Sequence, residues 1–342
     1  MKKELFKNKS FYLKILGVLV VVLILVFPLP YYIESPGSAE NLNHIITVDG
    51  KEDTQKGSFM MTTVQVQRAS LITLLVSQFN KNTDIVPKKT MLGDSNSAEY
   101  DRIQEYNMEN SKNEAIQIAL ELADIPYKKT YKGIYVLSVA DYSNFHDKLE
   151  VGDLIQKLDG KTMLESDEFI DSLKKMPIDQ KIQIGYERDG KKEEAEGKII
   201  ELPKLKRPGI GVTVIDQTAI DTDKNIEFKT KGVSGPSAGL MFSLELYSML
   251  SHKDLKQGRN IAGTGTIDDD GNVGDIGGID KKVVAAEKAG ATIFFAPNNK
   301  NDHGKTNYEE AKESAKKNHL KINIVPVKTI QDAINYLEKH TT

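Results

Sequence analysis

Residues 231–242 read KGVSGPSAGLMF, and the role of the serine in this stretch decides how the second half of the chain is interpreted. Gly235 and Pro236 form a small-residue turn before Ser237, and the apolar run that follows predicts a helix over about 237–250. Serine often caps such a helix. The same position would also hold a serine hydroxyl beside the unpaired N–H groups of a helix N-terminus. Ser237 is therefore either a capping residue or a nucleophile, and the local sequence alone favours the cap.

A serine nucleophile needs a base, because an alcohol is a poor nucleophile at neutral pH. No histidine lies beside the motif, but a lysine can serve where burial lowers its pKa. Lys281 and Lys282 lie in a second predicted helix near 280–289. The positions on the helical face of Lys282 are all small or apolar: Ile279, Val283, Ala285, Ala286 and Ala289. A buried ammonium is costly, so a lysine in this stripe needs a reason, and Lys282 is the candidate base.

The two motifs together resemble a known peptidase family. GPSAG and its apolar helix, followed by GTGTID and GNVGDIGGIDKKVVAA, look like the proteolytic domain of Lon-type Ser-Lys peptidases. The resemblance covers roughly 209–335, and the two motifs lie about 45 residues apart. It implies that Ser237 is the nucleophile, that Lys282 is the general base, and that Thr264 helps to orient the lysine.

The turn before the nucleophile keeps the family's pattern except at one position. Gly235 and Pro236 are expected to support the turn, whereas Ser234 stands where the family has an acidic residue. As the resemblance implies, neutral Lys282 would take the proton of Ser237 during attack on a peptide carbonyl. The N–H of Ser237 and a neighbouring amide would stabilise the oxyanion.

A β-rich unit is expected over about 127–202. The sequence GDLI at 152–155 and LDG at 158–160 match a G-D-x-I-x-x-x-x-G core, and this unit resembles a bacterial PDZ domain. Such domains bind an extended peptide as an added strand and often hold its carboxylate on backbone N–H groups. The alternative is a β-domain that serves only as a spacer. The candidate peptide-binding loop consists of Lys132, Gly133 and Ile134.

The N-terminus combines basic and apolar residues. Five lysines come before or at the edge of the apolar run ILGVLVVVLILVFPLPYYI at 15–33, which is close to the roughly 20 residues that span a bilayer. Lysines favour the cytoplasmic side, so we expect an uncleaved signal anchor with everything after Ser35 outside the cell. A cleaved signal peptide is the alternative. The five lysines are Lys2, Lys3, Lys7, Lys9 and Lys14.

Residues 35–125 offer strand and helix patterns but no chemistry, so they are expected to be a scaffold. Ser111 and Glu114 have the spacing of a capping box and predict a helix from there to about 123. The expected fold is α+β, with an N-terminal transmembrane helix, a β-rich PDZ-like domain and a C-terminal α/β Lon-type domain. The expected parts are 1–34, the cytoplasmic tip and signal anchor; 35–125, the extracytoplasmic scaffold; 126–203, the PDZ-like domain; and 204–342, the peptidase domain.

Composition and failed motifs narrow the chemistry of this 342-residue chain. Cysteine is absent, which excludes thiolate catalysis and disulfides, and the net charge of −3 offers no basic field for nucleic acid. Both GKT segments lack the glycine that a phosphate loop needs, and DDDG at 268–271 lacks the ligands of a calcium loop. The six histidines show no metal-ligand spacing. We therefore expect no cofactor, metal, nucleotide or nucleic acid.

The whole layout resembles the membrane-anchored PDZ–Lon proteases of Gram-positive bacteria, without an ATPase module. The resemblance implies an ATP-independent extracytoplasmic serine endopeptidase that cleaves secreted or membrane-proximal peptides and proteins. Its substrate and its oligomeric state are left open. The alternative is a catalytically idle membrane-anchored PDZ scaffold or a protease regulator.

Overall fold

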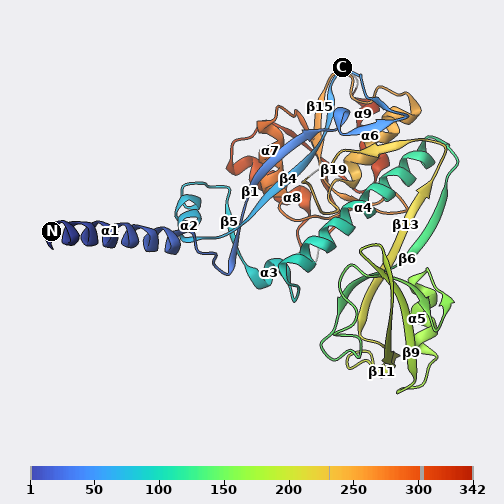
Figure 1. Cartoon of the computed structure of the whole chain (residues 1–342). Helices are drawn as coiled ribbons and strands as arrows, with labels where there is room; N and C mark the ends of the chain where they lie inside the picture. The colour runs from blue at the N-terminus through green and yellow to red at the C-terminus, as the bar shows by residue number, and fades with distance from the viewer. Residues whose placement is uncertain (1, 231, 301–303, 341–342) are drawn as a thin grey trace.

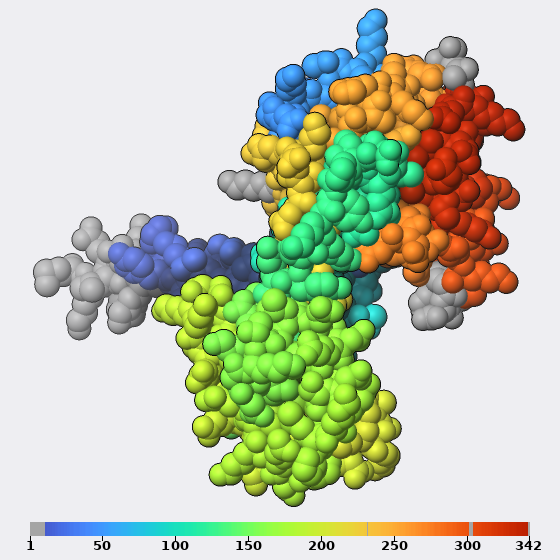
Figure 2. All heavy atoms as spheres, turned by 90° about the vertical axis from the view of Figure 1, so that its right-hand side faces the viewer, coloured from blue at the N-terminus to red at the C-terminus, as the bar shows by residue number. Residues whose placement is uncertain are grey.

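The structure is a computed structural model that describes residues 2–230, 232–300 and 304–340, with side chains described from residue 11 onward. The N-terminal helix α1 (Lys2–Val26) projects away from two folded bodies, and the smaller body is inserted within the chain of the larger one (Figure 1). Figure 2 shows the smaller body as a separate mass below the larger one. The first part of the long helix α4 (Ser97–Leu122) lies at their junction, where Arg102 donates to the Val151 carbonyl at 2.8 Å.

A six-stranded sheet in the order β19-β18-β15-β4-β1-β5 forms the centre of the larger body. The first four strands are parallel, and β1 and β5 continue the sheet in antiparallel fashion. The strands are β19 (Asn323–Val327), β18 (Ile293–Pro297), β15 (Asn260–Gly263), β4 (Ser58–Arg68), β1 (Tyr31–Asn41) and β5 (Asp84–Pro87).

Helices cover both faces of this sheet because the side chains of each strand alternate between two apolar cores. Phe59 and Met61 of β4 pack in the core that holds α4, α6 (Gly239–Ser251) and α9 (Ile330–Lys339). Met60 packs in the opposite core with α7 (Ile279–Lys288) and α8 (Asn307–Lys317). Successive strand residues point to opposite faces, so one strand can serve both cores. The result is a three-layer α/β/α arrangement.

The expected separate scaffold over 35–125 does not exist as a unit. β4 lies between β15 and β1, so this early segment forms the middle of the sheet whose other strands come from the end of the chain. α4 packs in the same core. Hydrophobic periodicity identifies a strand but not its partner, which is why the boundary drawn at residue 204 was wrong.

The start of α4 also differs from the expectation. The helix begins at Ser97, where Asn96 accepts from the N–H groups of Ala98 and Glu99 and Glu99 bonds back to the Asn96 N–H. Ser111 does not cap a helix. It lies in the middle of α4 and is fully buried.

The smaller body contains the predicted β-rich unit, a sheet in the order β10-β9-β7-β6-β13 with β8 paired to β7. Helix α5 (Ser166–Lys174) buries Phe169 and Leu173 in its core. β6 and β13 pair along a long antiparallel ribbon that reaches the larger body (Figure 1). The strands are β6 (Lys128–Val139), β7 (Leu154–Leu158), β8 (Lys161–Thr162), β9 (Lys181–Arg188), β10 (Lys191–Lys198) and β13 (Val212–Asp221).

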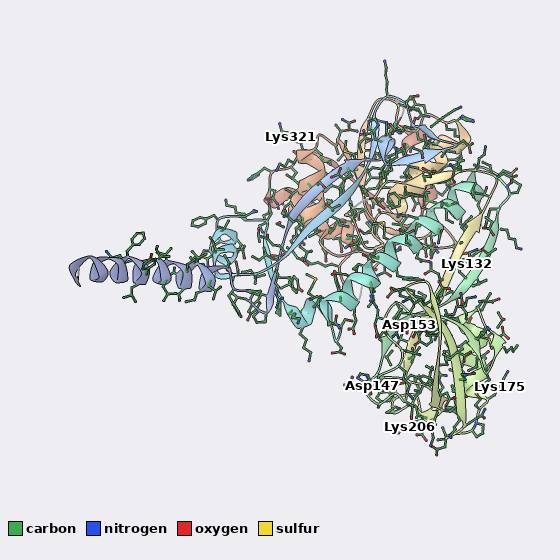
Figure 3. The ribbon with its side chains drawn as sticks, in the orientation of Figure 1. Lys132, Asp147, Asp153, Lys175, Lys206 and Lys321 are labelled. Atoms are coloured by element: carbon green, nitrogen blue, oxygen red, sulfur yellow. The ribbon has the colours of Figure 1, made fainter. Side chains whose placement is uncertain are left out.

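The GD pair of the smaller body has a structural role. Asp153 is fully buried and accepts hydrogen bonds from Arg188 Nε and Nη2, both at 2.7 Å, and from the Glu150 N–H at 2.8 Å. These bonds to Asp153 raise the pKa of Arg188. Asp153 lies inside the smaller body in Figure 3, and its pairing with Arg188 ties the turn before β7 to the end of β9.

Short elements complete the fold. β14 (Ile226–Phe228), β2 (Ile46–Val48) and β3 (Lys51–Glu52) form a three-stranded sheet, and β16 (Thr266–Ile267) pairs with β17 (Val273–Gly274). β11 (Ile200–Glu201) pairs with β12 (Pro208–Gly209). The remaining short helices are η1 (Leu42–His44), α2 (Leu71–Ser77) and α3 (Lys88–Leu92).

The N-terminal segment does not match the expected transmembrane helix. Within the ranges that the structure describes, no helix has both the length and the apolar character needed to cross a membrane. The expectation counted the apolar run to Ile33, but α1 ends at Val26 and residues 31–33 belong to β1. Pro28 and Pro30 lie between the two elements, and proline both lacks an N–H and restricts the residue before it.

Candidate active site

Ser237 lies in a tight turn just before α6, and its side chain does not cap that helix. α6 begins at Gly239, its N-cap residue is Ala238, and that cap has no side-chain hydrogen bond. The Ser237 hydroxyl instead lies 2.7 Å from the Nζ atom of Lys282. The capping interpretation, which the local sequence favoured, is therefore wrong.

The carboxyl end of β15 holds the turn in place. The Gly265 N–H donates to the Ser237 carbonyl at 3.0 Å, and the Leu240 N–H donates to the Gly265 carbonyl at 3.2 Å. Gly239 must be glycine here, because a Cβ atom would lie 2.9 Å from the backbone nitrogen of Ile267. These contacts bring the start of α6, from one face of the sheet, to the end of a central strand.

Thr264 connects the serine and the lysine. Its side chain is fully buried, donates to the Ser237 carbonyl at 3.0 Å, and lies 3.0 Å from Lys282 Nζ. A hydroxyl has one proton, and the carbonyl takes it, so Thr264 accepts a hydrogen bond from Lys282. A neutral amine that donates to Thr264 keeps its lone pair free for the proton of Ser237.

Lys282 lies on the buried face of α7, as the helical spacing predicts. Its exposed fraction is 4%, and Ile279, Val283 and Ala286 of the same helix are buried in the apolar core beneath the sheet. Burial lowers the pKa of Lys282 to about 7. In the described part of the chain no carboxylate forms an ion pair with it, so no charge opposes the effect of burial.

Ser237 and Lys282 line a cleft of about 1340 Å³. One wall consists of β1 and residues 61–66 of β4, and the other consists of the start of α4 and the nucleophile turn. β15 pairs with β4 only as far as Met61, so the later part of β4 meets the cleft without that neighbour.

Two contacts from α4 hold the nucleophile turn, and sequence reasoning missed both. The Ser111 hydroxyl donates to the Pro236 carbonyl at 3.0 Å, and the Gly235 N–H donates to the Gln104 carbonyl at 3.0 Å. Gly235 has φ of 92°, a conformation that favours glycine. The sequence signal for the first contact was a serine, Ser111, within the apolar stripe of a helix. Because Ser111 was interpreted as part of a capping box, this signal was missed.

The structure does not support the candidate peptide-binding loop at Lys132, Gly133 and Ile134. These residues lie in β6, which pairs with β13 on one side and β7 on the other, so no edge is free for a further strand. Figure 3 places Lys132 where β6 rises toward the larger body. A Cβ atom at Gly133 would lie 2.8 Å from the Ile155 carbonyl, which gives this glycine a packing role.

The edge strands of this sheet are β10 and β13, and α4 covers part of β13 through bonds from Tyr106 and Asn113 to the Asp216 and Thr218 carbonyls. α5 also lies beside β13, and the Ser166 N–H at the start of α5 donates to Asp216 of β13 at 2.6 Å. The sequence signal for this edge strand was GIGV at 209–212, whose small residues follow Arg207 and lead into β13.

Comparisons with known proteins agree with this geometry. Residues 229–338 match the family model described as the Lon protease (S16) C-terminal proteolytic domain, and residues 107–199 match that of the PDZ domain. A Lon protease from Aster yellows witches'-broom phytoplasma (strain AYWB) is 32% identical over 101 residues, which is 30% of this chain and 12% of that protein. One from Trichlorobacter lovleyi is 34% identical over 106 residues, which is 31% of this chain and 12% of that protein.

Among solved structures, the PDZ domain of the SdrC-like protein from Listeria monocytogenes is 38% identical to the part it matches. That match covers 25% of this chain and 90% of that chain, with a TM-score of 0.24. The chain spans only 12% of the length of the two Lon proteases. The chain thus contains a region similar to the Lon protease C-terminal proteolytic domain, within which Ser237, Thr264 and Lys282 meet, and a region similar to a PDZ domain.

Proposed function

We propose that this protein is an ATP-independent serine endopeptidase whose catalytic dyad is Ser237 and Lys282. The observation that carries the proposal is the 2.7 Å contact between Ser237 Oγ and the Nζ of a buried lysine whose pKa is lowered to about 7. About half of such lysines are neutral near that pH, so the base is present in its active form. The Lon-type proteolytic domain supports the same reaction class.

In the acylation step, the Ser237 proton passes to Lys282 Nζ while Oγ forms a bond to the peptide carbonyl carbon. The carbonyl oxygen becomes an oxyanion, which backbone N–H groups at the start of α6 stabilise. The intermediate then collapses, its C–N bond breaks, and the lysine ammonium gives its proton to the leaving amine. Thr264 holds the lysine at the angle that this transfer requires.

In the deacylation step, neutral Lys282 removes a proton from water as the water oxygen attacks the ester carbonyl. Collapse of the second intermediate breaks the bond to Ser237 Oγ, and the proton on Lys282 returns to that oxygen. Every proton is accounted for by one lysine and one serine, and no further group is needed.

We further propose that the substrates are extended peptides or flexible protein segments. The part of β4 that β15 leaves unpaired lines the cleft beside the dyad, and a peptide strand can pair with such an edge. The edge strand β13 offers a second peptide site in the PDZ-like region. Peptides and unfolded segments present an extended backbone whose N–H and C=O groups are free to pair with these edges, so they fit best.

We also propose that the protein works at the extracytoplasmic face of the cell membrane. The support is the apolar surface at the N-terminal end, where α1 exposes Phe11, Leu13 and Leu16 and the nearby α2 segment exposes Leu75 and Phe79. Exposed apolar side chains gathered in this way mark an interaction surface, and a lipid membrane would bury them. Recovery of the native protein in the soluble fraction of lysed cells would contradict this part of the proposal.

A direct test uses the purified full chain with a quenched peptide library, with and without ATP. We expect cleavage that does not depend on ATP and that disappears in Ser237→Ala and Lys282→Ala. A serine-directed phosphonate should label wild type at Ser237 and fail to label Ser237→Ala. An idle scaffold would show neither cleavage nor labelling, which would sink the proposal.

A further inference from the structure

Ser111 is one of the buried helical serines whose hydroxyl bonds outside its own helix, as those of Ser248 and Ser314 also do. A serine inside a helix normally bonds back to the carbonyl four residues earlier. Ser243 and Ser251 of α6 do so, donating to Gly239 at 2.9 Å and to Tyr247 at 2.6 Å. Ser111 is fully buried in α4, and its hydroxyl leaves the helix and donates to the Pro236 carbonyl, 125 positions away in sequence.

The Pro236 carbonyl belongs to the peptide plane that contains the N–H of Ser237. This peptide bond is trans, so the carbonyl and the N–H point in opposite directions within one rigid plane. A hydrogen bond that holds the carbonyl against α4 therefore turns the Ser237 N–H away from α4. Among the described residues that N–H has no hydrogen-bond acceptor, which is the state expected of a donor reserved for an oxyanion.

A second contact from the same helix holds the Ser234–Gly235 peptide plane, which lies two planes before the Pro236–Ser237 plane. The Gly235 N–H donates to the Gln104 carbonyl, and Gln104 lies about two helical turns before Ser111. From the described residues, the Pro236 carbonyl otherwise receives only the long 3.4 Å contact from the Gly239 N–H. Without Ser111, the hydrogen bonds on either side of the Pro236–Ser237 peptide plane would remain, but the plane itself, which carries the oxyanion donor, would lose its fixed orientation.

Resting on the proposed dyad mechanism, we propose that Ser111 is a positioning residue that aims the Ser237 N–H at the developing oxyanion. Ser111 touches neither substrate nor the dyad atoms and acts through the Pro236–Ser237 peptide plane. Its loss should affect the transition state, where the oxyanion forms, more than the bound substrate. α4 lies outside residues 229–338, so this role reaches the peptidase site from another part of the chain.

The test compares Ser111→Ala with Ser248→Ala in the full chain. Ser248 is also a fully buried serine within a helix, but its hydroxyl bonds to Gln55 and Lys253 at the far end of α6. For Ser111→Ala we expect kcat to fall about 10- to 100-fold with little change in KM, because misaligned catalytic groups cost rates of this order. Ser248→Ala should keep kcat within about twofold of wild type, because deleting this hydroxyl moves no group at the site.

A peptide aldehyde adds a readout that a packing defect would not change. Its adduct with Ser237 places a tetrahedral oxygen where the oxyanion forms, so Ser111→Ala should weaken aldehyde binding by the same factor as kcat. The midpoint of the pH–rate profile should stay in place, because Ser111 does not contact Lys282. Ser111→Cys keeps the side-chain volume and a weak donor, and should fall between wild type and Ser111→Ala.

Wild-type kcat and aldehyde affinity in a folded Ser111→Ala would overturn the proposal. If that variant does not fold, the same result in Ser111→Cys would overturn it. A fall in both Ser111→Ala and Ser248→Ala in proportion to lost thermal stability would also overturn it, since it would show a general packing effect. If wild type itself cleaves nothing, the proposed function fails instead, so the two failures are distinguishable.

Discussion

Lys281 and Lys282 are adjacent in the first turn of α7, and both are buried, with exposed fractions of 2% and 4%. Their surroundings differ completely. Lys281 Nζ bonds to Asp84, lies 3.2 Å from Asp280, and has Glu34 at 3.9 Å. Among the residues that the structure describes, Lys282 Nζ bonds only to the hydroxyls of Ser237 and Thr264. One step along a helix turns a side chain by about 100°, which is enough to separate the two environments.

The comparison shows that burial alone does not make a lysine a base. Burial lowers the pKa of both groups, but for Lys281 the hydrogen bond to Asp84 and the nearby charges outweigh burial, and the net pKa is raised. Lys282 has burial alone, and its pKa falls to about 7. The chemistry therefore depends on keeping carboxylates away from one lysine while supplying them to its neighbour.

The largest effect is expected from replacing each of the two lysines in turn. Lys282→Met should lower kcat/KM by at least about 10⁴-fold, since losing one member of a nucleophile–base pair has effects of this size. Lys281→Met should stay within about tenfold of wild type, because Lys281 makes no contact with Ser237. Peptide cleavage by the two purified variants measures both. Equal losses would show that the lysines are not separated as the structure indicates.

Replacement of Lys282 should lower the activity of the protein but raise its stability. The pKa of Lys282 is lowered on folding, so between about pH 7 and 10.5 the unfolded chain holds a proton that the folded chain lacks. Stability therefore rises with pH across this window, and the penalty is largest at pH 7 and below. Lys282→Met should raise the unfolding free energy at pH 6 by up to about 4 kcal/mol. Urea unfolding at pH 6 and pH 9 gives the difference.

The control for this experiment is again Lys281→Met. Its main partners Asp84 and Asp280 have side chains 62% and 47% exposed, so water replaces the lysine and the loss should be about 1 kcal/mol or less. A gain in stability for Lys281→Met, or none for Lys282→Met at low pH, would contradict the assigned environments.

Thr264→Val tests the role of the hydroxyl that bonds to both Lys282 and the Ser237 carbonyl. The variant keeps the shape but removes the acceptor for Lys282 and the donor to the Ser237 carbonyl. We expect kcat to fall about 10- to 100-fold, because the lysine loses its fixed orientation. Steady-state kinetics with thermal unfolding as a folding check measures this. Unchanged kcat in the folded variant would remove Thr264 from the mechanism.

The smallest expected effect is the pH dependence of wild type. The neutral form of Lys282 is the base, so kcat/KM should rise with pH and level off above about 7, and it should fall about tenfold per unit below that midpoint. Asp84→Asn should leave the midpoint unchanged, because Asp84 contacts Lys281 and not Lys282. A midpoint shift in Asp84→Asn would show that the two lysines share one electrostatic environment.

The sequence predicted several local features correctly because they depend on short-range patterns. The burial of Lys282 follows from the spacing of Ile279, Val283 and Ala286 on one helical face. The β-rich unit follows from strand periodicity and the GD motif. The same local reasoning failed where a pattern had two meanings, as at Ser111, whose spacing to Glu114 imitates a capping box inside an already formed helix.

The sequence by itself determined which residues can do the chemistry: a serine in a glycine-rich turn, and a lysine on an apolar helical face. Only the tertiary structure decided that their side chains meet at 2.7 Å, with Thr264 beside them and α4 behind the turn. It also placed β4 in the middle of the larger sheet and put β13, not β6, at an edge of the smaller one. The physical reason is that side-chain periodicity is a property of neighbours in sequence. Strand pairing and contacts between the faces of a sheet instead depend on segments that can lie more than 200 residues apart, as the bond between Thr62 and Gly263 shows.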